Sequence, residues 1–361
     1  MPWGRPATAA PEPSAERGAR DDRYERHVRP LPQPVRRVRE DWAWRDRDGR
    51  GEWLLNVEHV GADDAPVRML LVHGAGGNAA AMWPFAAHLS LLGARVTLVD
   101  LPGYGRSRQV SGRRGSVQYP DWQQVLVDLV EREHDERPLV LVGASMGGML
   151  ALDAAVTTGL AERVIATCLL DVTRAEVRSG IVRWPWLASV GLPLLGLARG
   201  PLAHLPLPIR WLTPMATISN SPGLSSEVLR DRRGGRGALP LGWYRTFLES
   251  RPALSRKAPD HATGPEKITQ PSVILLHPDE DRWTPPELSE DFLARLDGPT
   301  RSVRLVGCGH FPVEEPGFQQ LLDEVAAELS AIRGTPEATF WGATGSWGQG
   351  GNDEQTQQGW Q

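Results

Sequence analysis

The residues best suited to chemistry lie between Pro138 and Leu152. Within this stretch, Gly143-Ala144-Ser145-Met146-Gly147 fits the pattern Gly-x-Ser-x-Gly, in which the central serine is a nucleophile on a sharp turn. The apolar run Leu139–Val142 precedes the pattern and an apolar stretch at 148–156 follows it, which predicts a buried strand, a turn and a helix. The turn would present the Ser145 hydroxyl at a helix N-terminus, where backbone N–H groups favour developing negative charge. The stretch therefore predicts acyl transfer through Ser145.

A serine hydroxyl is a weak nucleophile and needs a general base within hydrogen-bonding distance. His310 is the best candidate among nine histidines, because it follows the last predicted strand directly, in Gly307-Cys308-Gly309-His310. The alternative is a loop histidine that packs on Phe311. His73 is predicted to be a structural residue beneath its own loop.

The base in turn needs a carboxylate that holds its tautomer and stabilises its charged form. The predicted strand 272–277 is followed by three acidic residues, Asp279, Glu280 and Asp281. Asp281 is preferred, Asp279 is the second choice, and Asp171 at the end of an earlier predicted strand is the third.

Two backbone N–H groups are needed to hold an oxyanion. Met146, which follows the serine, would supply one of them. The other is expected from the small-residue loop after the strand 68–73, where Ala75 is the first choice and Gly76 the second.

These residues must be positioned by a framework in which strands and helices alternate. Strands are predicted at 52–60, 68–73, 95–100, 139–142, 164–171, 272–277 and 302–306, and helices at 79–92, 119–135, 148–156 and 317–333. The strand 52–60 is expected to be half-exposed, near a sheet edge. Such alternation predicts an α/β fold with a mostly parallel sheet between two layers of helices.

The alternation of strands and helices stops between Asp171 and Lys267, where no strand-like run is found. Residues 172–267 are therefore predicted to form a helical cap that lines an apolar substrate pocket, inserted between core segments 40–171 and 268–333. Residues 1–39 are predicted to be a disordered extension and 334–361 a flexible tail. The arginine-rich run at 230–237 is expected to be a solvated, mobile loop.

Composition narrows the classes of function. The 361 residues are 40% hydrophobic and 23% charged, with a formal net charge of −4, which gives no electrostatic argument for nucleic acid or an anionic membrane. No run approaches the ~20 apolar residues of a spanning helix, and no secretory signal is recognisable, so a cytoplasmic location is expected. No motif for a metal or an organic cofactor occurs, and neither is expected.

Four motifs together resemble the α/β-hydrolase fold family. They are His73-Gly74-Ala75-Gly76-Gly77, Asp100-Leu101-Pro102-Gly103-Tyr104-Gly105-Arg106-Ser107, Gly143-Ala144-Ser145-Met146-Gly147-Gly148 and Gly307-Cys308-Gly309-His310. The resemblance covers about residues 53–333, and Pro278 stands where the family commonly has glycine. It implies a triad of Ser145, Asp281 and His310 and hydrolysis through an acyl-enzyme.

The sequence thus predicts a cofactor-independent serine hydrolase that cleaves a carboxylic ester of a small-to-medium, apolar acyl compound. The same fold also hosts amide, thioester and carbon–carbon bond hydrolysis and perhydrolysis, so these remain alternatives. A protein that binds a small apolar ligand without turnover is a third possibility. The oligomeric state is not predicted.

Overall fold

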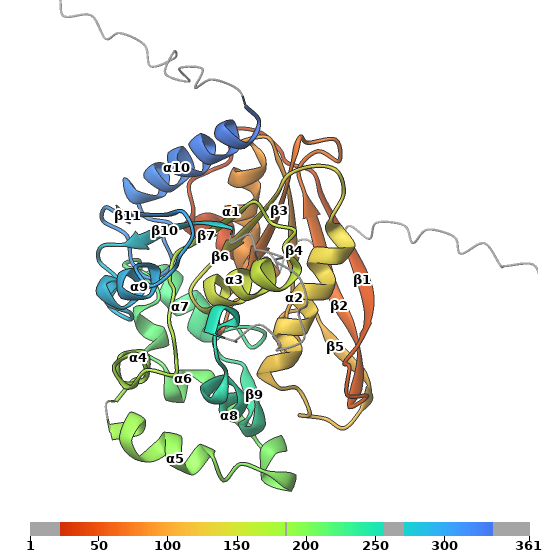
Figure 1. Cartoon of the computed structure of the whole chain (residues 1–361), viewed down its shortest axis with the longest axis vertical. Coiled ribbons are helices and arrows are strands. Elements are labelled where there is room, and N and C mark those ends of the chain that lie inside the picture. The colour runs from red at the N-terminus through yellow and green to blue at the C-terminus, as the bar shows by residue number, and fades with distance from the viewer. Residues whose placement is uncertain (1–21, 185, 256–270, 335–361) are drawn as a thin grey trace, which may run out of the picture.

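The computed structural model describes residues 22–184, 186–255 and 271–334, and these form one large sheet flanked by helices (Figure 1). The predicted tail lies almost wholly outside the described residues, as do positions 1–21 of the predicted extension. The nine strands follow the order β1-β2-β4-β3-β6-β7-β10-β11, with β5 paired to β2. Among the described residues, no helix has the length and apolar character required to cross a bilayer.

Strands β4, β3, β6, β7, β10 and β11 pair in parallel, whereas β1, β2 and β5 form an antiparallel extension at one side. The predicted α/β class with a mostly parallel sheet is therefore confirmed. The strand bounds are β1 Arg37–Arg45, β2 Gly51–Val60, β3 Val67–Val72, β4 Ala94–Val99, β5 Arg108–Gly112, β6 Leu139–Gly143, β7 Arg163–Ala166, β10 Ser272–Pro278 and β11 Thr300–Leu305.

Four helices pack on this sheet, in the contacting pairs α1 with α10 and α2 with α3. Their bounds are α1 Ala79–Ser90, α2 Tyr119–Glu133, α3 Met146–Thr158 and α10 Gly317–Ile332. The helix α1 begins where the Asn78 side chain accepts the Ala81 N–H, as an N-cap does. A shorter helix, α9 (Pro286–Leu293), follows β10 and was not predicted.

The prediction of disorder up to residue 39 is wrong for residues 22–39. A short 3-10 helix, η2 (Asp22–His27), and the first residues of the strand β1 occupy half of this range. The many charges suggested a solvated chain, but they are paired across the sheet: Arg37 and Arg39 on β1 both donate to Glu58 on β2, at 2.6 and 3.0 Å. Strand β2 consequently lies inside the sheet and is mostly buried, where half-exposure was expected.

The chain between β7 and β10 departs from the sheet and forms a group of short elements, coloured green to teal in Figure 1. We call residues 172–255 the inserted segment. Its elements are α4 Ala175–Ile181, η3 Leu187–Gly191, α5 Leu192–Leu195, η4 Gly200–His204, β8 Pro206–Pro208, α6 Ile209–Leu212, η5 Met215–Thr217, α7 Pro222–Arg230, β9 Ala238–Pro240, α8 Leu241–Glu249 and η6 Ala253–Ser255. The β8–β9 ladder was not predicted, because three-residue strands carry no periodic signal.

Strand β7 ends at Ala166, five residues before the predicted end at Asp171. The apolar residues that follow it were interpreted as strand because they are buried. They instead turn out of the sheet, and Leu170 and Val172 line the cavity described below.

Candidate active site

Ser145 lies at the turn between β6 and α3 with φ 55° and ψ −129°, and it is the one non-glycine residue in the described chain with a positive φ. Such backbone geometry is strained, and a strained residue of this kind persists only where its surroundings hold it. Two glycines permit the turn: a Cβ on Gly143 would lie 2.3 Å from the Gly147 carbonyl oxygen, and one on Gly147 would lie 2.3 Å from that of Val72. The local sequence therefore allows this turn because both glycines lack a side chain.

Gly147→Ala should lower the free energy of unfolding by about 3 kcal/mol, because the new methyl group meets the backbone of β3, which cannot move aside. Urea denaturation measures the loss. Gly180→Ala in α4 is the matched control, since its methyl group would meet only the flexible end of Leu288 at 3.1 Å and should change stability by less than about 1 kcal/mol. Equal effects of the two substitutions would contradict this account.

The structure brings together the three side chains selected from the sequence. The Ser145 hydroxyl lies 2.7 Å from Nε2 of His310, and Nδ1 of the same ring lies 2.7 Å from Oδ2 of Asp281. Since an ionised carboxylate can only accept, Nδ1 carries the proton and Nε2 presents a lone pair to the serine hydroxyl. These contacts join the ends of β6 and β10 to the loop after β11, at the carboxyl edge of the parallel sheet.

Asp281 is held by a full set of hydrogen bonds. Its Oδ1 accepts the N–H groups of Trp283 and Thr284 at 2.8 and 2.9 Å, and its Oδ2 accepts the Thr284 hydroxyl at 2.6 Å. Burial by itself raises the pKa of the Asp281 carboxyl, but the charge of His310 and the hydrogen bonds from His310 and Thr284 outweigh it and hold the pKa well below its usual range. The Asp281 carboxylate is therefore ionised at neutral pH, where it accepts the hydrogen bond from Nδ1 of His310.

The two alternative acids occupy other positions. Asp279 accepts the Gly307 N–H at 2.8 Å and so anchors the loop that carries His310. Asp171 accepts from Thr173 and from Arg295, the latter at 3.3 Å. Neither forms a hydrogen bond with the His310 ring in the described structure.

Further residues orient His310, and none of them was predicted from the sequence. The Trp283 ring packs on the imidazole with ring centroids 4.6 Å apart. The Glu314 carboxylate accepts the Gly309 N–H at 3.3 Å and the Asn220 N–H at 2.8 Å, which ties the histidine loop to the inserted segment. Glu314 lies only four residues after His310, but an acidic residue at that distance carries no recognisable sequence signal.

The backbone N–H groups of Ala75 and Met146 donate no hydrogen bond within the described chain, and both residues line the cavity beside Ser145. Gly76, the second choice, does not line it. His73 lies beneath this loop as predicted: it accepts the Leu101 N–H on Nε2 at 3.1 Å and donates from Nδ1 to the Gly74 carbonyl at 2.8 Å. Burial lowers the pKa of His73 to about 4, so the ring is neutral and structural.

The run 230–237 differs from the predicted solvated loop. Asp231 is 1% exposed, and its Oδ2 accepts from the Asn78 side chain at 2.8 Å and from the Tyr24 hydroxyl at 2.9 Å. A Cβ on Gly234 would lie 2.6 Å from the Gly76 carbonyl oxygen. The loop 230–237 therefore packs on the loop that carries Ala75. The arginines on both sides of Asp231 suggested a solvated run, although the Asp231 side chain is buried.

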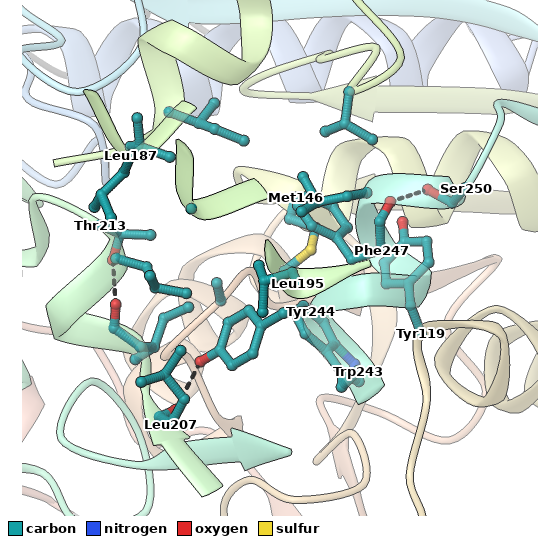
Figure 2. Close-up of a pocket in the computed structure, with 18 of the residues that line it drawn as sticks. Tyr119, Met146, Leu187, Leu195, Leu207, Thr213, Trp243, Tyr244, Phe247 and Ser250 are labelled. Atoms are coloured by element: carbon teal, nitrogen blue, oxygen red, sulfur yellow. Dashed lines mark hydrogen bonds between the residues drawn. The ribbon is translucent and has the colours of Figure 1, made fainter. Parts of the chain in front are cut away.

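A cavity of about 410 Å³ opens next to Ser145. Its walls come from the inserted segment and from the sheet edge, and Figure 2 shows Met146, Leu195, Trp243, Tyr244 and Phe247 gathered around the same space. None of the described lining residues is basic, and nearly all are apolar. The one carboxylate in the wall, that of Asp153, accepts from Gln123 at 2.8 Å and from the Ala253 N–H at 2.7 Å. The cavity thus suits an uncharged, apolar group.

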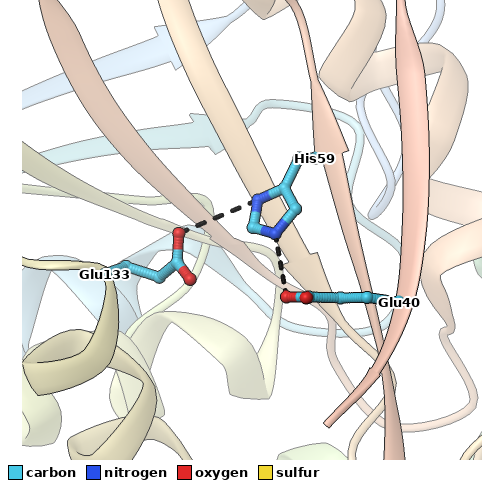
Figure 3. Close-up of side chains that lie close together, drawn as sticks. All are labelled: Glu40, His59 and Glu133. Carbon is cyan, nitrogen blue, oxygen red and sulfur yellow. Dashed lines mark hydrogen bonds and ion pairs between the residues drawn. The ribbon is translucent and has the colours of Figure 1, made fainter. Parts of the chain in front are cut away.

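One cluster in the described chain has side chains close enough together to hold a metal ion: Glu40, His59 and Glu133 (Figure 3). The His59 ring lies 3.1 Å from Glu40 and 3.7 Å from Glu133. Arg132 pairs with Glu40, and Arg68 lies 3.8 Å from Glu133, so guanidinium groups already neutralise both carboxylates. The cluster does not line the cavity, and we interpret it as an ion-pair network that ties β1 and β2 to α2.

Comparison with known proteins agrees with this architecture. Residues 69–324 match the alpha/beta hydrolase family. The "Uncharacterized protein YfhR" of Escherichia coli is 31% identical over 127 residues, 34% of this chain and 43% of that protein, so less than half of its length is matched. A 2-hydroxy-6-oxononadienedioate/2-hydroxy-6-oxononatrienedioate hydrolase of Cupriavidus pinatubonensis is 26% identical over 275 residues, 73% of this chain and 87% of its own.

Among solved structures, a soluble variant of monoglyceride lipase from Saccharomyces cerevisiae has a TM-score of 0.60 at 17% identity. The alignment covers 82% of this chain and 97% of the lipase, and at that identity it speaks for the fold alone. The matched residues 69–324 run from β3 to α10 and include the serine turn and the histidine loop. The chain therefore belongs to the alpha/beta hydrolase family.

Proposed function

We propose that this protein is a serine hydrolase that cleaves carboxylic esters of apolar acyl compounds, with Ser145, His310 and Asp281 as its catalytic triad. The observation that carries the proposal is the pair of 2.7 Å contacts that link the hydroxyl, the imidazole and a buried carboxylate at the wall of an apolar cavity. Hydroxyl, base and orienting acid in this arrangement make up the machinery of acyl transfer.

In the acylation step, the Ser145 Oγ attacks the ester carbonyl carbon and its proton passes to Nε2 of His310. The carbonyl oxygen becomes an oxyanion, which the N–H groups of Ala75 and Met146 stabilise. When the tetrahedral intermediate collapses, the bond to the alcohol oxygen breaks, and that oxygen takes the proton back from Nε2. The alcohol leaves, and the acyl group remains on Ser145.

In the deacylation step, Nε2 of His310 removes a proton from water while the water oxygen attacks the acyl carbon. The same two N–H groups hold the second oxyanion. Collapse breaks the bond to the serine oxygen, which recovers its proton from Nε2, and the carboxylic acid is released. Asp281 remains ionised throughout and stabilises the transient imidazolium.

The cavity wall supports an uncharged acyl group as the substrate. A carboxylate buried there would meet no described cation and would face the Asp153 side chain, which makes its desolvation costly. The relative from Cupriavidus is named for a dioate, which carries two carboxylates. We therefore expect this chain to differ from that relative in the substrate it accepts.

Activity on p-nitrophenyl esters should rise with acyl length. Each methylene that enters the cavity contributes about 0.8 kcal/mol, so kcat/KM should increase about fourfold per methylene from acetate upward until the cavity is full. The matched control is p-nitrophenyl hydrogen adipate, which has the six-carbon chain of the hexanoate with a terminal carboxylate. Equal kcat/KM for hexanoate and adipate would contradict an apolar acyl site.

A direct test of the nucleophile uses a fluorophosphonate probe, which labels only activated serines. Ser145 should be labelled, and the label can be located by peptide mass spectrometry. In His310→Ala, labelling should fall to background because no base accepts the serine proton. Labelling of another serine, or undiminished labelling of His310→Ala, would count against the proposed mechanism.

A further inference from the structure

Most of the large exposed apolar side chains among the described residues lie in one stretch of the inserted segment. Of the eleven large apolar side chains that are exposed in the described chain, eight lie between Trp184 and Trp211. We call these eight the apolar face. Among them Leu197, Leu194 and Trp186 are 69%, 60% and 59% exposed. The helix α5, in the middle of this range, lies at the outer edge of the molecule (Figure 1). Exposed apolar surface gathered in this way marks a contact site.

The stretch of chain that carries most of the apolar face has charges of one sign. Between residues 177 and 226 the sequence contains four arginines, Arg178, Arg183, Arg199 and Arg210, and no aspartate or glutamate. Two arginines outside this stretch, Arg174 and Arg245, form ion pairs with Glu176 and Glu249, the latter at 2.8 Å. None of the four forms a salt bridge with a carboxylate in the described structure. The Glu249 carboxylate, which lies in a cleft beside Arg178 and Pro193, is neutralised by Arg245. The face is therefore locally cationic in a protein whose net charge is −4.

The apolar face is also continuous with the cavity at Ser145. Leu194, Leu197 and Leu202 are exposed to solvent and also belong to the lining of that cavity. Next to them a separate cleft of about 390 Å³ is lined by Arg199 and His204 together with Arg113 from the loop before α2. Apolar surface, the cavity opening and basic groups thus occur on the same part of the molecule.

From these observations we infer that the inserted segment docks on an anionic phospholipid surface. Leucine and tryptophan side chains enter the boundary between headgroups and acyl chains, while arginines remain among the anionic headgroups. The face has both components, and each arginine near an anionic surface adds about 1 kcal/mol.

Charge also decides against a second copy of this chain as the occupant. A twofold dimer through this face would bring the four arginines close to their symmetry mates, and the stretch 177–226 offers no carboxylate to pair with them. Two carboxylates of the inserted segment outside this stretch, Glu176 and Glu249, already pair with Arg174 and Arg245. A phospholipid surface supplies the missing negative charge. The contact itself does not depend on ester hydrolysis, but one consequence rests on the proposed function: an apolar ester could pass from the bilayer to Ser145 without crossing water.

The docking is tested by co-sedimentation of the full chain with vesicles, using Ser145→Ala so that no lipid is consumed. One set contains phosphatidylcholine with phosphatidylglycerol, and the other contains phosphatidylcholine alone. The protein should bind the anionic vesicles at least about tenfold more tightly, and added salt should reduce this difference. Absence of binding to the anionic vesicles would overturn the inference, and it would leave the proposed hydrolase activity untouched.

Two variants identify the surface. Replacing Trp186, Leu194 and Leu197 together by serine should weaken binding to anionic vesicles by at least about tenfold. Arg199→Gln should weaken it about fivefold, with no effect on phosphatidylcholine vesicles. The matched control is Val306→Ser, since Val306 is 52% exposed and follows β11, away from α5. Equal losses in the control would overturn the assignment of the face.

Self-association provides the remaining outcome. If gel filtration shows a dimer that the triple serine variant converts to a monomer, and vesicles are not bound, the face joins two copies and the membrane inference is wrong. If the protein binds anionic vesicles and the triple variant loses binding at an unchanged oligomeric state, the inference stands.

Discussion

Ser145→Ala should lower kcat for p-nitrophenyl butyrate by a factor on the order of 10⁶, because the attacking oxygen is absent and no other hydroxyl of the described cavity wall is hydrogen-bonded to Nε2 of His310. The residual rate should stay above that of water, since the cavity and the N–H groups of Ala75 and Met146 would still bind the substrate. Steady-state rates with purified enzyme, together with a single-turnover measurement, give the factor.

A matched control for Ser145→Ala is Ser179→Ala, because Ser179 is an exposed serine whose hydroxyl, among the described residues, bonds only to the Ala175 carbonyl within α4. That variant should keep the wild-type kcat. Both variants should keep the circular dichroism spectrum of the wild type, so that a loss of rate is not a loss of fold. Turnover of Ser145→Ala at the wild-type rate would refute the proposed nucleophile.

Asp281→Asn should lower kcat by about 10⁴-fold with little change in KM. The asparagine amide would present an N–H to Nδ1 of His310, which favours the tautomer with its proton on Nε2, so the ring could no longer accept the serine proton. Substrate binding is unaffected, because Asp281 does not line the cavity. The matched variant is Asp279→Asn, at the second-choice acid two residues earlier, which should keep kcat within about tenfold of wild type. The reverse order of the two effects would make Asp279 the acid.

The same Asp281 variant carries a prediction for stability against pH. The pKa of this carboxyl in the folded state lies below its unfolded value of about 3.9, so its ionised form stabilises the fold above that pH and the contribution is lost as pH falls further. The difference in unfolding free energy between wild type and Asp281→Asn should therefore be constant above about pH 5 and shrink below about pH 4. A difference that grows on acidification would contradict the depressed pKa.

The candidate site was predictable from the sequence to the extent that it depends on backbone geometry. A turn such as that at Ser145 leaves no space for a side chain at Gly143 or Gly147, so a short local sequence pattern predicts it. His310 follows a strand directly, and the chain order of serine, acid and histidine limits the acid to a few positions. The choice between Asp281 and Asp279 depended on orientation: the hydrogen bonds from Trp283 and Thr284 direct Asp281 to His310, whereas Asp279 bonds to Gly307.

Residues that act through distant contacts were not predictable. Asp231 bonds to Tyr24 and Asn78, which are 207 and 153 positions away in the chain, and nothing in the run of arginines around it indicates that it is buried. The strand β1 was missed for the same reason: its charges satisfy one another only when β2 lies beside it. The net charge of −4 likewise gave no indication that the apolar face is cationic, because carboxylates elsewhere in the chain outnumber its arginines.

The sequence by itself determined the α/β framework and the residue types that can perform acyl transfer, because these follow from periodicity and from local steric limits, and the resemblance of its motifs indicated the family. Only the tertiary structure decided which acid faces His310, which loops support Ala75, how the inserted segment shapes the cavity, and which apolar side chains remain exposed. Those features depend on contacts between segments that are far apart in the chain. Such a contact cannot be recognised from the sequence of either segment alone.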